Sequence, residues 1–315
     1  MTGIGEAVAV TAGGTWHAGG QGAARSAFAC AVLRDGTVEC WGYLRNILGT
    51  AGVDTSSVPL PVPGVAHALA IAGGDAHVCV LLEGGSVECW GVNEQGELGN
   101  GLTPLCSLCA SDPAPVAVST LSGAMDVAGK GSQFTCSALA DGSVHCWGAF
   151  NIGPASLGTT VSAWPAPILG VVTSPGGMDV GYFHACAVMR DDGRVQCWGQ
   201  NHLGELGDNP DPHDFGPITV AGTHSAVAVA AGNSFSCALL SDASVQCWGT
   251  NAFGQLGDGT LVTSTGAVTV VGLTDATAIS AGYNHACAVT KAGSIRCWGA
   301  IGAASVSVPT TVAGF

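Results

Sequence analysis

The tripeptide Cys-Trp-Gly occurs six times in the 315-residue chain at nearly constant spacing. The copies lie at 40–42, 89–91, 146–148, 197–199, 247–249 and 297–299, which gives intervals of 49, 57, 51, 50 and 50 residues. A fixed internal period of this length indicates that one supersecondary unit is repeated along the chain. We therefore expect six repeats within a single domain spanning 1–315, at about 6–64, 65–120, 121–174, 175–223, 224–273 and 274–315.

A second cysteine precedes each copy, and the residues between the two cysteines carry a hairpin signal. Cys30 and Cys40 enclose an Asp-Gly pair with alternating apolar residues on both sides, which is typical of a β-hairpin. A three-residue loop with Gly36 in the left-handed conformation would place the two cysteines opposite each other, within disulfide distance. The predicted disulfides are Cys30–Cys40, Cys79–Cys89, Cys136–Cys146, Cys186–Cys197, Cys237–Cys247 and Cys287–Cys297, with a small loop disulfide Cys106–Cys109. Buried free cysteines, and a redox-active or metal-binding role for the last pair, are the alternatives.

Each hairpin lies between two further extended segments. An alternating apolar segment ending in glycine precedes it, as in 227–232, and a Pro- or Val-rich segment follows it, as in Pro217–Val220. Four strands per repeat and no helical periodicity predict an all-β, six-bladed β-propeller, with four antiparallel strands and one disulfide in each blade. The chain begins and ends on repeat strands, so we expect its terminal strands to close the ring, with Val306–Val312 meeting the first blade. An open solenoid is the alternative.

Composition limits the partners and the compartment. The net charge is −14 with only eight Lys and Arg residues, so we expect no nucleic-acid partner. Mean hydropathy is +0.42, but no apolar stretch is long enough for a membrane span, so no membrane insertion is expected. Disulfides indicate an oxidising setting, extracellular or in the cell envelope. Residues 1–6 lack a secretion signal, and we therefore expect a mature domain with an added initiator methionine.

The repeat motif resembles a known family. The fifth copy continues into Thr250-Asn-Ala-Phe-Gly-Gln-Leu-Gly-Asp-Gly259, and related Asn-x-x-Gly-x-Leu-Gly segments occur at 93–99 and 201–207. Together with the glycine-ended strand and the Cys-Trp-Gly hairpin, this pattern resembles the regulator of chromosome condensation repeat. The resemblance implies a propeller and a range of functions: guanine-nucleotide exchange, plant ultraviolet reception, or inhibition of β-lactamases by a secreted bacterial protein. The chain departs from the founding members of the family in having six repeats rather than seven, in its paired cysteines and in lacking a basic surface. The secreted inhibitor is the closest in setting.

The connection between the glycine-ended strand and the first cysteine is the expected binding region, because propellers commonly bind through loops near their axis. Two of the three tyrosines in the chain fall at this position, and tyrosine is frequent in binding hot spots. The predicted binding residues are Tyr182, Phe183, Tyr283, Asn284, Asn233, Asp75 and Trp16. The predicted function is non-enzymatic extracellular recognition of a protein or surface polymer, without a cofactor. Side chains that merely cover the channel mouth are the alternative, and the long loops 102–115 and 152–167 are the next candidate site.

A second hypothesis concerns metal binding. The position two residues before the first cysteine alternates between Phe and His, so that His77, His184 and His285 fall on alternate repeats. Three imidazoles that reach the channel would suit Zn or Cu and would make the chain a metal-binding protein or metalloenzyme. Histidines that hydrogen-bond a neighbouring loop are the other interpretation. No nucleophile elbow, phosphate loop or His-Glu-x-x-His motif is present, and exchange-factor activity on a small GTPase is the third hypothesis.

The six tryptophans of the Cys-Trp-Gly motifs are expected to be structural. Neighbouring residues of a strand point to opposite faces of the sheet, so cysteine occupies one face and tryptophan the other. We expect the indoles to pack between blades.

Overall fold

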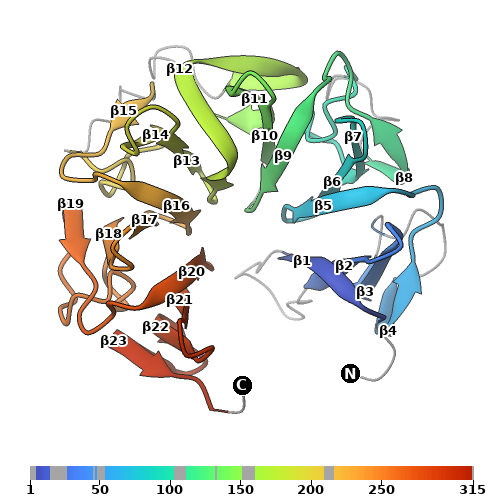
Figure 1. The fold of residues 1–315 in the computed structure, drawn as a ribbon. Coiled ribbons are helices and arrows are strands. Elements are labelled where there is room, and N and C mark those ends of the chain that lie inside the picture. The colour runs from blue at the N-terminus through green and yellow to red at the C-terminus, as the bar shows by residue number, and fades with distance from the viewer. Residues whose placement is uncertain are drawn as a thin grey trace. The chain divides into compact units, whose positions relative to one another are not determined.

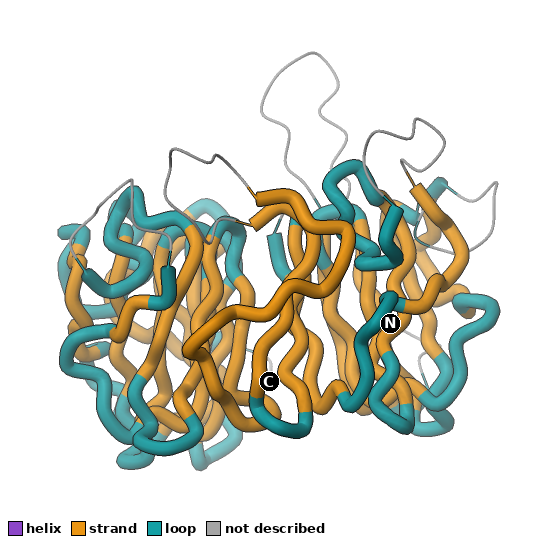
Figure 2. The backbone as a smooth tube through the Cα atoms, turned by 90° about the horizontal axis from the view of Figure 1, so that it is seen from above, coloured by secondary structure: helices purple, strands orange, loops and turns teal. Residues whose placement is uncertain are grey.

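The computed structural model describes residues 5–14, 27–44, 47, 54–102, 111–131, 133–150, 160–208 and 216–313, and these contain strands and loops without a helix (Figures 1 and 2). Within these ranges there is accordingly no helix able to cross a membrane. The strands are β1 (Ala7–Gly13), β2 (Phe28–Leu33), β3 (Val38–Tyr43), β4 (Thr55–Pro61), β5 (Ala68–Gly73), β6 (His77–Leu82), β7 (Val87–Val92), β8 (Ser111–Ala117), β9 (Ala124–Gly129), β10 (Phe134–Leu139), β11 (Ser143–Phe150), β12 (Thr160–Val180), β13 (His184–Met189), β14 (Val195–Gly199), β15 (Ile218–Thr219), β16 (Ala226–Ala231), β17 (Phe235–Leu240), β18 (Val245–Gly249), β19 (Ser264–Thr269), β20 (Ala276–Ala281), β21 (His285–Thr290), β22 (Ile295–Ile301) and β23 (Ala304–Thr311).

Four of the repeats form separate four-stranded antiparallel sheets. Their strand orders are β1-β2-β3-β4, β5-β6-β7-β8, β16-β17-β18-β19 and β20-β21-β22-β23. The third and fourth repeats share one seven-stranded sheet of order β15-β14-β13-β12-β11-β10-β9, because the long strand β12 pairs on both sides (Figure 1). The all-β, four-stranded repeat is therefore confirmed, whereas the described strands form five sheets rather than six separate ones.

The two ends of the chain do not share a sheet. Strand β23 pairs with β22, and β1 pairs with β2, each within its own repeat. Residues 304–311 follow β22 through a tight turn and form the outer strand of the last sheet. Closure of the ring by the terminal strands, with Val306–Val312 meeting the first blade, stays a prediction.

The hairpins have the predicted register. Cys30 pairs with Cys40 across β2 and β3, and the loop is closed by Gly36 N–H donating to Leu33 O at 2.9 Å. Gly36 has φ +78°, where a side chain would be strained. Disulfides join all six predicted cross-strand pairs in the described residues. Cys106 and Cys109 lie outside the described residues.

The tryptophans connect consecutive repeats. Five of the six are buried, with 0–1% of their surface exposed, and Trp41 is half-buried. Each of three indoles donates a 2.9 Å hydrogen bond to a carbonyl in the Asn-x-x-Gly-x-Leu-Gly turn of the preceding repeat: Trp147 to Glu97, Trp248 to Glu205 and Trp298 to Gln255. The packing interpretation is confirmed for Trp90, Trp147, Trp248 and Trp298, each of which packs in a core cluster with residues of the preceding repeat.

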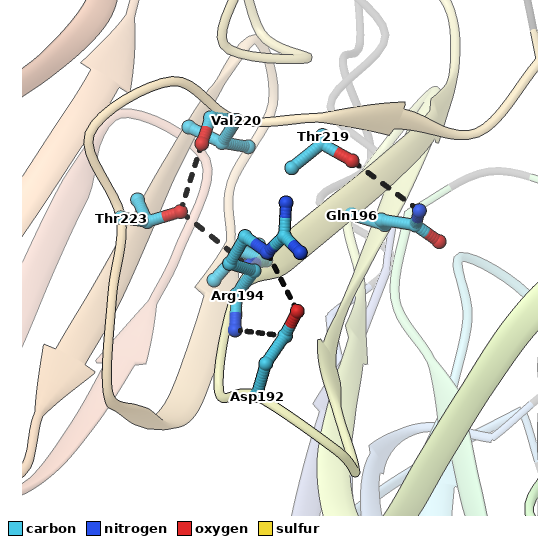
Figure 3. Close-up of polar contacts among 7 residues, drawn as sticks. Asp192, Arg194, Gln196, Thr219, Val220 and Thr223 are labelled. Atoms are coloured by element: carbon cyan, nitrogen blue, oxygen red, sulfur yellow. Dashed lines mark hydrogen bonds and ion pairs between the residues drawn. The ribbon is translucent and has the colours of Figure 1, made fainter.

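The short strand β15 in the fourth repeat is held by side chains as well as by its backbone (Figure 3). Gln196 Nε2 donates to Thr219 Oγ1 at 3.3 Å, across the β14–β15 pair. Thr223 Oγ1 donates to Val220 O at 3.0 Å and accepts from Val195 N at 3.4 Å. These bonds hold the chain in place at β15, which contributes only two residues to the sheet.

The chain divides into two compact units. The first comprises Met1–Phe150 with Val161–Pro167, and the second comprises Asn151–Thr160 with Ile168–Phe315. Tyr182, Phe183 and Tyr283 all belong to the second unit. A single domain over 1–315 stays a prediction.

Candidate binding site

Three consecutive connections in the second unit are linked to one another by backbone hydrogen bonds. They join the first and second strands of the fourth, fifth and sixth repeats. Tyr182 N donates to Gly232 O at 3.1 Å, and Asn233 N donates to Tyr283 O at 3.1 Å. Gly232 is required sterically, since a Cβ there would lie 2.1 Å from the ring of Phe235. The three connections thus form a fixed backbone platform.

Three predicted residues meet on this platform, and we call Tyr182, Phe183 and Tyr283 the aromatic cluster. The rings of Tyr182 and Tyr283 lie 4.8 Å apart between centroids at an interplanar angle of 80°, a favourable edge-to-face pair. The ring of Phe183 lies 6.1 Å from that of Tyr182. Tyr283 is 50% exposed and Phe183 is 40% exposed. The structure therefore brings together residues 101 positions apart and leaves two of their rings open to solvent.

The remaining predicted binding residues are placed differently. Asn233 and Asn284 belong to the same three connections and are half-buried. Asp75 lies in the first unit, where it is buried and its N–H donates to Gly131 O at 2.9 Å. Trp16 lies outside the described residues. Five of the seven predicted binding residues thus belong to the platform, and their role in binding stays a prediction.

Sequence reasoning missed a second set of exposed apolar side chains in the second unit. Leu203, Phe253, Leu261 and Val262 are 44%, 42%, 60% and 71% exposed. They lie between the third and fourth strands of their repeats, and alternation of antiparallel strands places these turns at the same end of each sheet as the platform. For Leu203 and Phe253 the signal was present in the variable positions of the Asn-x-x-Gly-x-Leu-Gly motif, whereas Leu261 and Val262 lie beyond the motif.

The turn that carries three of these side chains is held by the buried amide of Asn251. Its Nδ2 donates within 3.1–3.2 Å to Asp258 Oδ1 and to oxygens of Thr260 and Val262. Its Oδ1 accepts from Leu256 N at 2.9 Å. The exposed residues are therefore displayed on an ordered turn.

The same motif matches known repeats in register. A model of the regulator of chromosome condensation repeat matches residues 69–97, 178–205, 226–255 and 276–300, and a second model of that repeat matches 192–239. These matches fall on the glycine-ended strands, the cysteine hairpins and the turns described above. The second, fourth, fifth and sixth repeats of the chain are therefore similar to the regulator of chromosome condensation repeat.

Solved structures of similar fold include a receptor kinase ectodomain and a protein described with binding to Gsp1p and histones. Human WBSCR16 is 18% identical with a TM-score of 0.80, covering 98% of this chain and 82% of its own. Prp20p from Saccharomyces cerevisiae is 21% identical with a TM-score of 0.71, covering 91% and 75%. The CRINKLY WD40 ectodomain of the Arabidopsis thaliana receptor kinase ACR4 is 23% identical with a TM-score of 0.50, covering 90% and 78%. At these identities the likeness establishes a β-propeller fold and leaves function open.

The second and fourth repeats of the chain bury a glutamate carboxylate at the position where the fifth repeat has a glutamine amide. Glu97 Oε2 accepts from Gln95 N at 2.7 Å, and Glu205 Oε2 accepts from Leu203 N at 2.6 Å. Burial raises the pKa of Glu97 to about 7, and it also raises the pKa of Glu205. Gln255 makes the corresponding bond without a charge, accepting from the N–H of residue 253 at 2.8 Å. The two carboxylates brace their turns through these hydrogen bonds.

Two of the three candidate metal-binding histidines hydrogen-bond a hydroxyl group of the next repeat. His77 Nε2 lies 2.8 Å from Thr135 Oγ1, and His184 Nε2 lies 2.7 Å from Ser236 Oγ. Both side chains are buried, and burial lowers the pKa of His77 to about 4. His285 is half-buried. Within the described ranges no three His, Cys, Asp or Glu side chains form a group that would hold a metal, and the three-histidine site stays a prediction.

Proposed function

We propose that this chain is a non-enzymatic recognition propeller of six blades that acts outside the cell. It binds another protein or a surface polymer through the connections that carry the aromatic cluster. The observation that carries the proposal is the exposure of Phe183 and Tyr283 on a backbone platform fixed by hydrogen bonds.

Exposure of these rings is costly for a soluble protein unless a partner covers them. Burying an exposed aromatic side chain removes a large apolar area from water, and aromatic residues dominate binding hot spots. A platform that is already ordered loses little conformational freedom when it binds. Exposed Leu203 and Phe253 at the same end of their sheets enlarge the available apolar surface.

The disulfides support the extracellular assignment. All twelve described cysteines are paired within hairpins, a state that persists in oxidising compartments. The receptor kinase ectodomain offers a precedent for this fold in such a setting. The Prp20p structure is described with binding to Gsp1p and histones, but a disulfide-rich chain is a poor candidate for exchange activity on an intracellular GTPase.

Affinity capture tests the proposal. Immobilised wild-type protein is compared with the triple variant Tyr182→Ala, Phe183→Ala, Tyr283→Ala for capture from the native extracellular fraction. We expect each substitution to weaken binding by more than about 1 kcal/mol with little change in melting temperature. The matched control is Leu169→Ala, which truncates an 81% exposed side chain outside the platform and leaves capture intact.

Unchanged capture by the triple variant would show that the binding site lies elsewhere. The metal hypothesis is tested separately, by elemental analysis of protein purified without chelators. Stoichiometric Zn or Cu that is lost on substitution of His77, His184 and His285 by alanine would favour a metal-binding protein instead.

A further inference from the structure

The described Lys and Arg residues of the second unit lie at one end of its sheets. Arg190, Arg194 and Lys291 lie in turns between the second and third strands. Arg296 reaches the same end, where its Nη1 donates to Gly272 O at 2.7 Å. The connections at the opposite end, described over 181–183, 200–208, 232–234, 250–263 and 282–284, contain no Lys or Arg. The aromatic cluster therefore lies at an end without lysine or arginine in its described connections.

Hydrogen-bond acceptors accompany the aromatic rings at this end. Asp179, three residues before Tyr182, places its Oδ2 2.9 Å from Ala231 N, next to the platform. Asn233 Oδ1 is shielded from solvent and has no donor among the described residues. The turns of the fourth and fifth repeats add the carboxylates of Asp208 and Asp258. Acceptors and carboxylates thus lie at the same end of the sheets as the aromatic rings.

We infer that the aromatic cluster binds a cationic side chain, Arg or Lys, presented by a protein partner. The faces of Tyr and Phe rings carry negative electrostatic potential and attract a guanidinium or ammonium group placed over them. At this end of the unit the described connections offer no basic side chain to compete for the rings. The net charge of −14 also attracts a basic protein at long range.

This inference rests on the proposed function and names the partner's chemistry at the same site. The guanidinium group of arginine suits it best, because it is planar, stacks on aromatic faces and has donors for neighbouring carboxylate and amide oxygens. A glycan partner would need no positive charge, and the two are separated by the test below.

The probe is a fluorescein-labelled arginine hexapeptide, compared with a citrulline hexapeptide of equal length, in anisotropy titrations of the full chain. Tyr182→Leu and Tyr283→Leu remove the ring face and keep both the net charge and an apolar side chain, so non-specific attraction is unchanged. We expect each to weaken binding of the arginine peptide roughly two- to fivefold. Tyr283→Phe retains the ring face and should bind like wild type, as should Phe253→Leu, which removes an exposed ring outside the cluster.

Equal binding of the arginine peptide by wild type and both leucine variants would overturn the inference, as would equal binding of the citrulline peptide. If affinity capture is nevertheless lost in the triple alanine variant, the proposed function stands and the partner is recognised without a cation. If neither the peptide nor capture responds to any change in the cluster, both proposals are wrong.

Discussion

The buried carboxyl group of Glu97 makes the free energy of unfolding depend on pH. In the folded chain its pKa is about 7, against an ordinary value of 4.5, because burial disfavours the charged form. The folded state therefore holds this proton more tightly than the unfolded state does. Its favourable contribution is complete below about pH 4.5 and is lost as the pH rises through about 7.

The magnitude follows from the shift. One pKa unit corresponds to about 1.4 kcal/mol, so ionisation of Glu97 costs the folded state about 3 kcal/mol above pH 8. About 2 kcal/mol of this cost appears between about pH 5.5 and pH 8.5, a range that lies above the sequence pI of about 4.7. Glu97→Gln removes the titration and reproduces the residue found at Gln255.

The assay is urea unfolding of the wild type and Glu97→Gln at those two pH values. The glutamine carries a constant penalty, since Gln255 Nε2 is buried without a hydrogen-bond partner among the described residues. The informative quantity is thus the change with pH in the stability difference, and we expect the variant to gain about 2 kcal/mol on the wild type as the pH rises. Glu6→Gln, which removes an exposed carboxylate paired with Arg34, is the control and should show no such trend, because arginine stays charged over this range. Parallel pH profiles for wild type and Glu97→Gln would refute the reasoning.

Other substitutions test the packing. Gly232→Ala places a Cβ 2.1 Å from the ring of Phe235 and should destabilise by about 2–3 kcal/mol, whereas Gly266→Ala meets no atom within 4 Å and should be nearly neutral; thermal melting distinguishes them. Asn251→Ala leaves several buried partners unpaired and should cost roughly 2–4 kcal/mol in urea unfolding. Replacing both cysteines of Cys237–Cys247 by alanine should cost about 2–3 kcal/mol, and intact mass should fall by about 2 Da per disulfide relative to the reduced chain.

Local patterns made the repeat predictable. The Asp-Gly loop fixes the hairpin register, and a fixed register places Cys30 opposite Cys40, so six disulfides follow from spacing alone. The shared strand β12 was not predictable, because the alternation of its residues does not reveal that one continuous strand pairs on both sides. The sheet to which a terminal strand belongs was not predictable either, since a strand at a chain end can pair with its own hairpin or with a distant repeat, and periodicity is identical in both cases; β23 pairs with its own hairpin.

The sequence predicted which connections carry the site residues, but it did not predict which side chains contact one another. Repeat alignment placed Tyr182 and Tyr283 at equivalent connections, yet their 4.8 Å ring contact depends on side-chain directions that spacing does not specify. The motif likewise did not predict the burial of His77 and His184, because the hydroxyl groups that they contact come from the next repeat. Long-range partners of this kind are set by packing between repeats.

The indole hydrogen bonds have a direction along the chain. Trp248 bonds to the turn of Glu205 in the repeat before it, and Trp298 bonds to the turn of Gln255 in the same way. We expect loosening of one turn to affect the indole of the repeat that follows, because that indole is bonded to the turn. The fluorescence of each of these indoles therefore reports on the turn of the preceding repeat. In a variant in which Trp248 is the only tryptophan, we expect the fluorescence to respond to loosening of the fourth repeat before the fifth repeat, which contains Trp248, unfolds.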